Sequence, residues 1–113
     1  TAQALFITLE DAKRDYDKGQ VLMLDARPIE DFKNLHIKGA ISLYYDDVKS
    51  QWKNVIGKAD RNREIITYCS DPECESAIKL ADTLISVGFT KVSIMLDGIP
   101  AWKEAGYPVE SGE

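Results

Sequence analysis

Short apolar runs alternate along this chain with longer stretches of helical periodicity, and this alternation limits the fold more than any other feature. Residues 21–24 and 92–95 are short and mostly apolar, without the strict alternation of a strand that faces water on one side. Such runs are typical of strands buried on both faces of a parallel sheet. The β-branched and aromatic stretch at residues 64–68 has the composition of a strand, and residues 41–43 are a further candidate.

Helical periodicity is present in segments around these strands. The predicted helices cover residues 8–18, 46–56, 77–87 and 99–105, and each is followed by a glycine that can end it. Residues 29–40 are expected to be turn-rich, and an extended tail is expected from Pro108. Alternating strands and helices predict an open α/β sheet with helices on both faces. We expect one domain over residues 1–113, without an internal repeat.

Charge and composition argue against several kinds of partner. The net charge is −5 and residues 61–63 form the longest basic stretch, so nucleic-acid binding is not expected. No apolar run approaches the ~20 residues of a membrane span. Two cysteines and one histidine are too few for a disulfide scaffold or a structural zinc site, and no cofactor is expected. No signal peptide is visible, and residue 1 is Thr. The sequence therefore leaves two compartments open: the cytoplasm, or the periplasm if an upstream signal was removed.

Cys69 lies between a predicted strand and a predicted helix, which is the position expected for a ligand site in an open α/β sheet. A loop that curls before a helix start directs backbone N–H groups at a negative group. Such a setting favours the thiolate form of a cysteine. A buried cysteine can equally serve as a small hydrophobic side chain, and the residues of the loop alone do not separate the two interpretations.

Five motifs, in order along nearly the whole chain, resemble those of rhodanese-like domains. They are Leu24-Asp25-Ala26-Arg27, Phe32 followed by His36-Ile37-Lys38-Gly39-Ala40, Ile66-Thr67-Tyr68-Cys69, Leu96-Asp97-Gly98-Ile99-Pro100-Ala101-Trp102, and Gly106-Tyr107-Pro108-Val109. The resemblance implies a mostly parallel five-stranded sheet flanked by helices. It also implies sulfur transfer through a persulfide on Cys69, from a small sulfur donor to a thiol or protein acceptor. A loop with Cys-x4-Cys-x-Ser spacing resembles a variant found among bacterial members.

The loop after Cys69 departs from the pattern of members that use thiosulfate, in which basic residues follow the cysteine. The residues expected to surround the anion are Ser70, Asp71, Pro72, Glu73, Cys74, Glu75 and Ser76. Three of these are acids, which oppose a thiolate and repel anions, so thiosulfate is a doubtful physiological donor. Related phosphatases have Cys-x5-Arg spacing, but Glu75 stands at the arginine position and cannot stabilise phosphoryl oxygens.

Cys74 has two interpretations of equal weight. It is either a partner that resolves a persulfide or sulfenate on Cys69 as a disulfide, or a small residue packed under the start of the helix. Asp25 and Arg27 are expected to form structural hydrogen bonds that fix neighbouring loops, with substrate binding by Arg27 as the minority option. His36, the only histidine, is expected to be a structural turn residue rather than a general base.

Two functional classes follow from these residues. The first is a single-domain sulfurtransferase whose nucleophile is Cys69, which the presence of the cysteine favours. The second is a binding or redox-sensing module with the same fold and no turnover, which the acidic loop favours. The sequence does not identify the donor, the acceptor, the partner protein or the oligomeric state.

Overall fold

Five parallel strands form the central sheet of the structure, a computed structural model that describes residues 3–112. The strand order is β1, β6, β5, β2, β4, and each neighbouring pair is parallel. The bounds are Leu5–Phe6 for β1, Lys91–Met95 for β6, Glu64–Tyr68 for β5, Leu22–Asp25 for β2 and Ile41–Ser42 for β4. The predicted α/β class is therefore confirmed, and β5, the strand that leads to Cys69, lies at the centre of the sheet.

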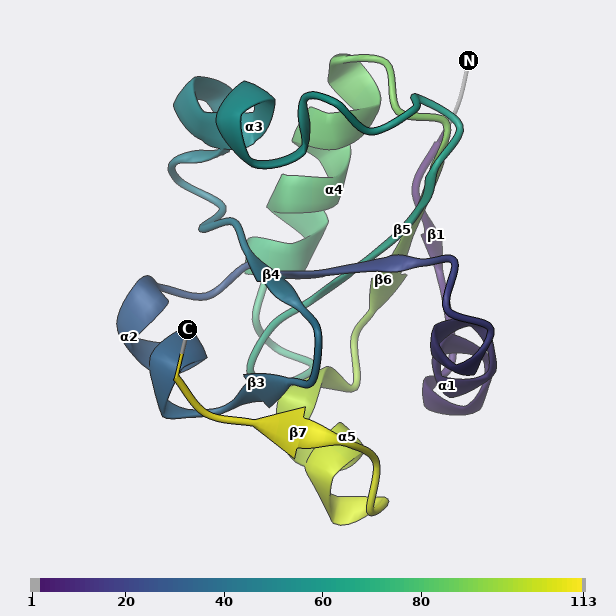
Figure 1. The fold of residues 1–113 in the computed structure, drawn as a ribbon, viewed down its shortest axis with the longest axis vertical. Coiled ribbons are helices and arrows are strands. Elements are labelled where there is room, and N and C mark those ends of the chain that lie inside the picture. The colour runs from purple at the N-terminus through teal and green to yellow at the C-terminus, as the bar shows by residue number, and fades with distance from the viewer. Residues whose placement is uncertain (1–2, 113) are drawn as a thin grey trace.

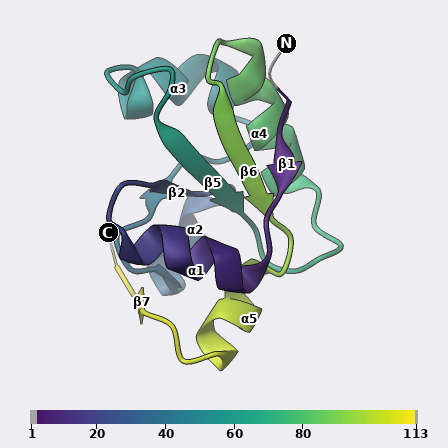
Figure 2. The ribbon, with the colours of Figure 1, turned by 90° about the vertical axis from the view of Figure 1, so that its right-hand side faces the viewer.

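Helices cover both faces of this sheet, as expected. On one face lie α3 (Val48–Ile56) and α4 (Ser76–Ser86), and on the other lie α1 (Leu9–Asp17) and α5 (Gly98–Glu104) (Figure 1). Figure 2 shows α1 in front of the sheet and α3 and α4 on its far side. Because the strands are parallel, their carboxyl ends share one edge of the sheet, and the loops that follow them meet there.

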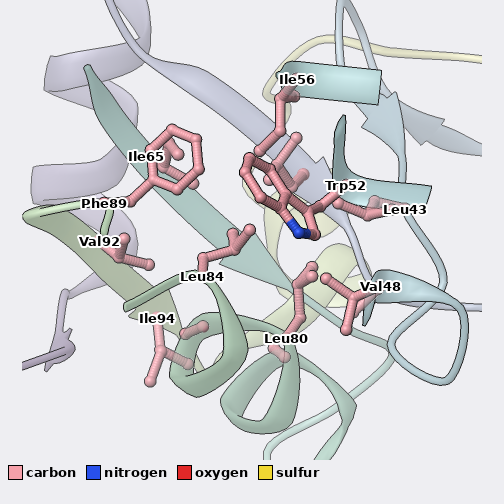
Figure 3. Packing of buried hydrophobic residues seen from close by; sticks show 14 of the residues in the cluster. Leu43, Val48, Trp52, Ile56, Ile65, Leu80, Leu84, Phe89, Val92 and Ile94 are labelled. Carbon is pink, nitrogen blue, oxygen red and sulfur yellow. The ribbon is translucent and has the colours of Figure 1, made fainter. Parts of the chain in front are cut away.

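The larger apolar core fills the space between the sheet and the α3–α4 layer (Figure 3). Leu80 and Leu84 of α4 and Ile65 of β5 belong to it and are fully buried. Trp52 of α3 meets Phe89 edge to face, with the ring centroids 6.0 Å apart. Burial of apolar surface stabilises a fold by roughly 25 cal/mol per Å². This layer therefore fixes α4, and with it the loop that precedes α4, against the central strands.

The segment expected to be turn-rich, residues 29–40, contains a short helix and a short strand instead. The helix α2 covers Ile29–Asn34, and the strand β3 covers His36–Ile37. The carbonyl of Pro28 accepts hydrogen bonds from the N–H groups of Asp31 and Phe32, and Phe32 is buried. A helix this short shows no periodicity in the sequence, because one buried side chain is enough to orient it.

The tail expected after Pro108 forms the strand β7 (Val109–Glu110), which pairs with β3 in an antiparallel ribbon. Figure 1 shows this ribbon below the main sheet, beside α5. Trp102 of α5 is fully buried, and its Nε1 donates a hydrogen bond of 2.8 Å to the carbonyl of Pro108. The tail is therefore attached to the body of the domain at the end where the loops of the sheet meet.

Candidate active site

Cys69 directly follows the central strand β5, and the chain around it is held on both sides. Its side chain is nearly buried, with 4% exposed. Its carbonyl accepts a hydrogen bond of 3.0 Å from the N–H of Ile99, in α5. Within β5, the hydroxyl of Thr67 donates a hydrogen bond of 2.9 Å to the carbonyl of Ala77, in the first turn of α4. The strand and the helix that flank the loop are thus tied to each other.

The loop between β5 and α4 turns back on itself through hydrogen bonds made by Asp71. The carbonyl of Asp71 accepts from the N–H of Cys74 at 3.1 Å, and its Oδ1 accepts from the N–H of Glu73 at 2.9 Å. The hydroxyl oxygen of Ser70 lies 3.9 Å from the Sγ of Cys69. This turn brings the second cysteine back toward the first.

Gly98, at the start of α5, packs against the backbone of the same loop. Its φ is +80°, and a Cβ at this position would lie 2.9 Å from the backbone nitrogen of Asp71 and 3.0 Å from the carbonyl oxygen of Cys69. Only glycine fits such a close approach without displacement. In the sequence, Gly98 is recognisable only as part of the motif at residues 96–102. Its contact with the loop has no local signal, since the two segments are far apart in the chain.

Cys69 and Cys74 are joined by a disulfide, with their Cα atoms 6.3 Å apart. That separation lies within the usual range for bonded cysteines. Cys74 is also half-buried and packs against the larger core. Cys69 has no free thiol in this state, and its nucleophilic form requires reduction of the bond.

The rim of the loop is acidic and exposed. Asp71, Glu73 and Glu75 are exposed, as is Pro72, while Ser70 and Ser76 are half-buried. The loop contains no lysine or arginine. The ammonium group of Lys79, on the first turns of α4, lies 5.4 Å from the ring centre of Tyr45. Negative charge therefore dominates the loop itself, as the sequence indicates.

Asp25 and Arg27 form a buried, bidentate ion pair at the carboxyl end of β2. The Nε of Arg27 donates to Oδ1 of Asp25 at 3.0 Å, and Nη2 donates to Oδ2 at 2.8 Å. The same Nη2 also donates to the carbonyl of Leu35, at the end of α2. Hydrogen bonding to Asp25 raises the pKa of Arg27 despite its burial. These contacts connect the loop after β2 to the segment that follows α2.

His36 lies on β3 and contacts residues of that ribbon and of α2. Its ring is stacked on Phe32 with the centroids 3.8 Å apart, and its Nδ1 lies 2.8 Å from the Phe32 carbonyl oxygen. Its Nε2 lies 3.1 Å from Oε2 of Glu110, on β7. Hydrogen bonds from the N–H of Gly39 and from His36 lower the pKa of Glu110. The interactions of His36 thus connect β3 to β7 and α2.

The described residues hold neither a candidate metal site nor a membrane-spanning helix. Among residues 3–112, no group of three or more His, Cys, Asp or Glu side chains could hold a metal ion. None of the helices in the same part of the chain has the length and apolar character needed to cross a bilayer.

Comparison with known proteins shows the family to which the fold belongs. The sequence model of the family described as "Rhodanese-like domain" matches residues 8–105. The chain belongs to the rhodanese-like domain family. The matched residues include β5, the Cys69 loop and Gly98, so the candidate site lies within the matched range.

Two curated proteins are similar to this rhodanese-like domain over most of its length. The Escherichia coli K12 "Uncharacterized protein YibN" is 26% identical over 116 residues, which cover 100% of this chain and 77% of that protein. The Mycobacterium tuberculosis "HTH-type transcriptional regulator Rv0324" is 29% identical over 106 residues, which cover 94% of this chain but 45% of the regulator. This chain therefore spans less than half the length of the regulator.

Solved structures agree with the fold. The BH2092 protein of Bacillus halodurans superposes with a TM-score of 0.84 at 28% identity, covering 96% of this chain and 77% of that one. The Alr3790 protein of Anabaena gives 0.80 at 25% identity, covering 94% and 80%. A thiosulfate sulfurtransferase of Pseudomonas aeruginosa gives 0.78 at 21% identity over 97% of this chain and 21% of that one. At that identity the last similarity supports the fold alone.

Proposed function

We propose that this rhodanese-like domain is a sulfurtransferase that carries sulfane sulfur as a persulfide on Cys69. The observation that carries the proposal is the position of Cys69. It follows the central strand β5, is nearly buried, and stands before a loop that curls into α4. Membership of the family supports the same chemistry.

The transfer begins with reduction of the disulfide, which frees Cys69 as a thiolate. The thiolate attacks the sulfane sulfur of a donor. The bond between that sulfur and the remainder of the donor breaks, and this remainder leaves with the electron pair. The terminal sulfur of the new persulfide is then attacked by a thiol of an acceptor, and Cys69 leaves as a thiolate. Backbone N–H groups of the loop would stabilise the anion at both stages, apart from Pro72, which has no N–H, and Glu73 and Cys74, whose N–H groups bond to Asp71.

The acidic rim bears on which donor is used. Thiosulfate carries two negative charges, and Asp71, Glu73 and Glu75 oppose its approach through exposed carboxylates. A donor of lower charge, such as the persulfide of a small thiol, meets less repulsion. The alternative, a binding or redox-sensing module, would keep the fold and the cysteine. It would not release the sulfur-free part of the donor in repeated turnovers.

The test compares wild type with Cys69→Ser and Cys74→Ser under excess reductant, using benzenethiosulfonate, a donor with a single negative charge. We expect Cys69→Ser to lower the rate of benzenesulfinate release by roughly a thousandfold or more, because the covalent step is lost. Cys74→Ser keeps the nucleophile and is the matched control. Circular dichroism checks that both variants fold. Release by Cys69→Ser at the wild-type rate would show that the mechanism is wrong, and single-turnover release that does not repeat would favour the non-turnover module.

A further inference from the structure

Cys74 is the second thiol group of the loop, and it has no role in the transfer of sulfur from Cys69 to an external acceptor. Its Cα lies 6.3 Å from that of Cys69, and the two sulfurs bond directly in the structure. We propose that Cys74 resolves the Cys69 persulfide and releases hydrosulfide, so that the domain reduces sulfane sulfur to sulfide. This inference rests on the proposed function, because it needs the persulfide on Cys69 to form first.

The resolving step balances without any further reactant. The thiol of Cys74 gives up its proton, and its sulfur attacks the inner sulfur, the Sγ of Cys69. The bond between that Sγ and the terminal sulfur breaks, and the terminal sulfur leaves as hydrosulfide with the electron pair and the proton. The product is the Cys69–Cys74 disulfide. Cys74 and Cys69 are oxidised to the disulfide, and the sulfane sulfur is reduced to sulfide.

The loop is built so that this attack needs little rearrangement. The turn made by the carbonyl and carboxylate of Asp71 fixes the N–H groups of Cys74 and Glu73. The other side is fixed by Gly98, whose Cα stands against the backbone of Cys69 and Asp71. A thiol held beside a persulfide reacts as part of the same molecule, which gives it a large advantage over a thiol that must diffuse in.

Burial adds to this advantage. An outside acceptor has to reach a sulfur on a side chain that is 4% exposed. Cys74 already occupies the position from which that sulfur is reached, since the two form a bond there. In the reduced domain, resolution by Cys74 therefore competes well with transfer to an acceptor in solution.

The disulfide then has to be reduced before another turnover, and the exposures indicate where a reductant attacks. Cys74 is half-buried whereas Cys69 is buried. A thiolate of an external dithiol therefore attacks the Sγ of Cys74, and Cys69 leaves as the thiolate. The second thiol of the reductant breaks the mixed disulfide, which frees Cys74 and oxidises the reductant to its own disulfide. The partner inferred is thus a dithiol oxidoreductase that approaches the Cys74 side of the loop.

The first experiment uses reduced protein, freed of reductant, with benzenethiosulfonate. The sulfinate released counts persulfide formation, and the sulfide released counts resolution. Wild type is expected to give one equivalent of each and to lose both thiols. Cys74→Ser is expected to give one equivalent of sulfinate, to keep one extra sulfur atom on Cys69 by mass, and to release sulfide at least about tenfold more slowly.

The outcomes separate the two proposals. Wild type that keeps the extra sulfur and a free Cys74 thiol, with no more sulfide than Cys74→Ser, would overturn the resolving role and leave the sulfurtransferase intact. Absence of sulfinate from both proteins would overturn the proposed function and the inference with it. Thiol counting on wild type alone decides the resolving role if Cys74→Ser does not fold.

A second experiment tests the route of reduction. The oxidised domain is mixed with a thioredoxin whose second active-site cysteine is replaced by serine, so that the mixed disulfide cannot be released. Peptide mapping is expected to find the thioredoxin bonded to Cys74. An adduct on Cys69 would contradict the inferred order of attack.

Discussion

At the scale of single residues, the pair of Asp25 and Arg27 illustrates how a buried charge is retained. Asp25 is fully buried and accepts four hydrogen bonds from Arg27, one of them from its backbone N–H. A buried ion pair adds little net stability, but removal of one partner leaves a charge that water does not reach. Substitution of either residue is therefore expected to be strongly destabilising, even though the net contribution of the pair to the free energy of unfolding is small.

We expect Asp25→Asn to lower the free energy of unfolding by about 3 kcal/mol, because the Arg27 charge would stay buried without its counterion. The matched control is Asp17→Asn, which removes the partner of Lys13 from an exposed pair on α1 and should cost less than about 0.5 kcal/mol. Urea denaturation followed by circular dichroism measures both. If the two variants lost equal free energy of unfolding and only Asp25→Asn impaired sulfur transfer, Asp25 would have a role in substrate binding instead of stability.

At the scale of elements, the contact between α5 and the loop before α4 controls the shape of the candidate site. Two glycines allow this contact to be separated from backbone preference. Gly98 has φ +80° and touches the loop, whereas Gly106 has φ +81° and nothing within 4 Å of the position that a Cβ would take. Alanine at either position meets the same unfavourable φ, so only the steric term differs.

We expect Gly98→Ala to be more destabilising than Gly106→Ala by about 1–3 kcal/mol, the usual range for overpacking. Since the added methyl would displace the backbone of Cys69 and Asp71, Gly98→Ala should also slow sulfinate release from benzenethiosulfonate, while Gly106→Ala should leave it unchanged. Urea denaturation and the single-turnover assay check the two effects. If both variants behave alike, the close approach of α5 does not shape the loop.

At the scale of the whole molecule, the acids that matter most are those on the Cys69 loop, where the proposed substrate would enter. The net charge is −5, and three exposed acids surround the loop. Charges separated by more than a Debye length, about 10 Å at 0.1 M salt, interact weakly. Acids on the loop should therefore affect an approaching anion far more than acids elsewhere on the surface.

We expect Asp71→Lys and Glu75→Arg to raise the turnover of thiosulfate about three- to tenfold at low salt, with a smaller gain at moderate salt. Asp82→Lys is the matched control, because it makes the same change in net charge on an exposed residue of α4 that lies about 10 Å along the helix from Glu75. Sulfite release at two salt concentrations is the measurement. Robust wild-type turnover with no gain in either loop variant would contradict the electrostatic argument, as would an equal gain in Asp82→Lys.

The elements with strong local signals were predictable. The predicted start of α1 is confirmed, since the hydroxyl of Thr8 accepts a hydrogen bond of 3.1 Å from the N–H of Asp11. The bounds of β5 agree with the stretch of β-branched and aromatic residues at 64–68. The capping bond of Thr8 spans only three residues, and the composition of residues 64–68 is itself a strand signal, so the sequence carries both directly. The role of Cys69 stays a prediction, although its place after a strand and before a helix followed from the same local signals.

The sequence alone determined the order of the longer strands and helices, the α/β class and the placement of two cysteines in one loop, because these depend on local preference and on the periodicity of apolar residues. Only the tertiary structure decided that β1 joins β6 at the edge of the sheet, that β3 pairs with β7, and that Gly98 holds the loop in which Cys74 reaches Cys69. Strands of two residues have no period to recognise. Contacts between segments far apart in the chain form only when the buried layers of α4, the sheet and α5 bring those segments together.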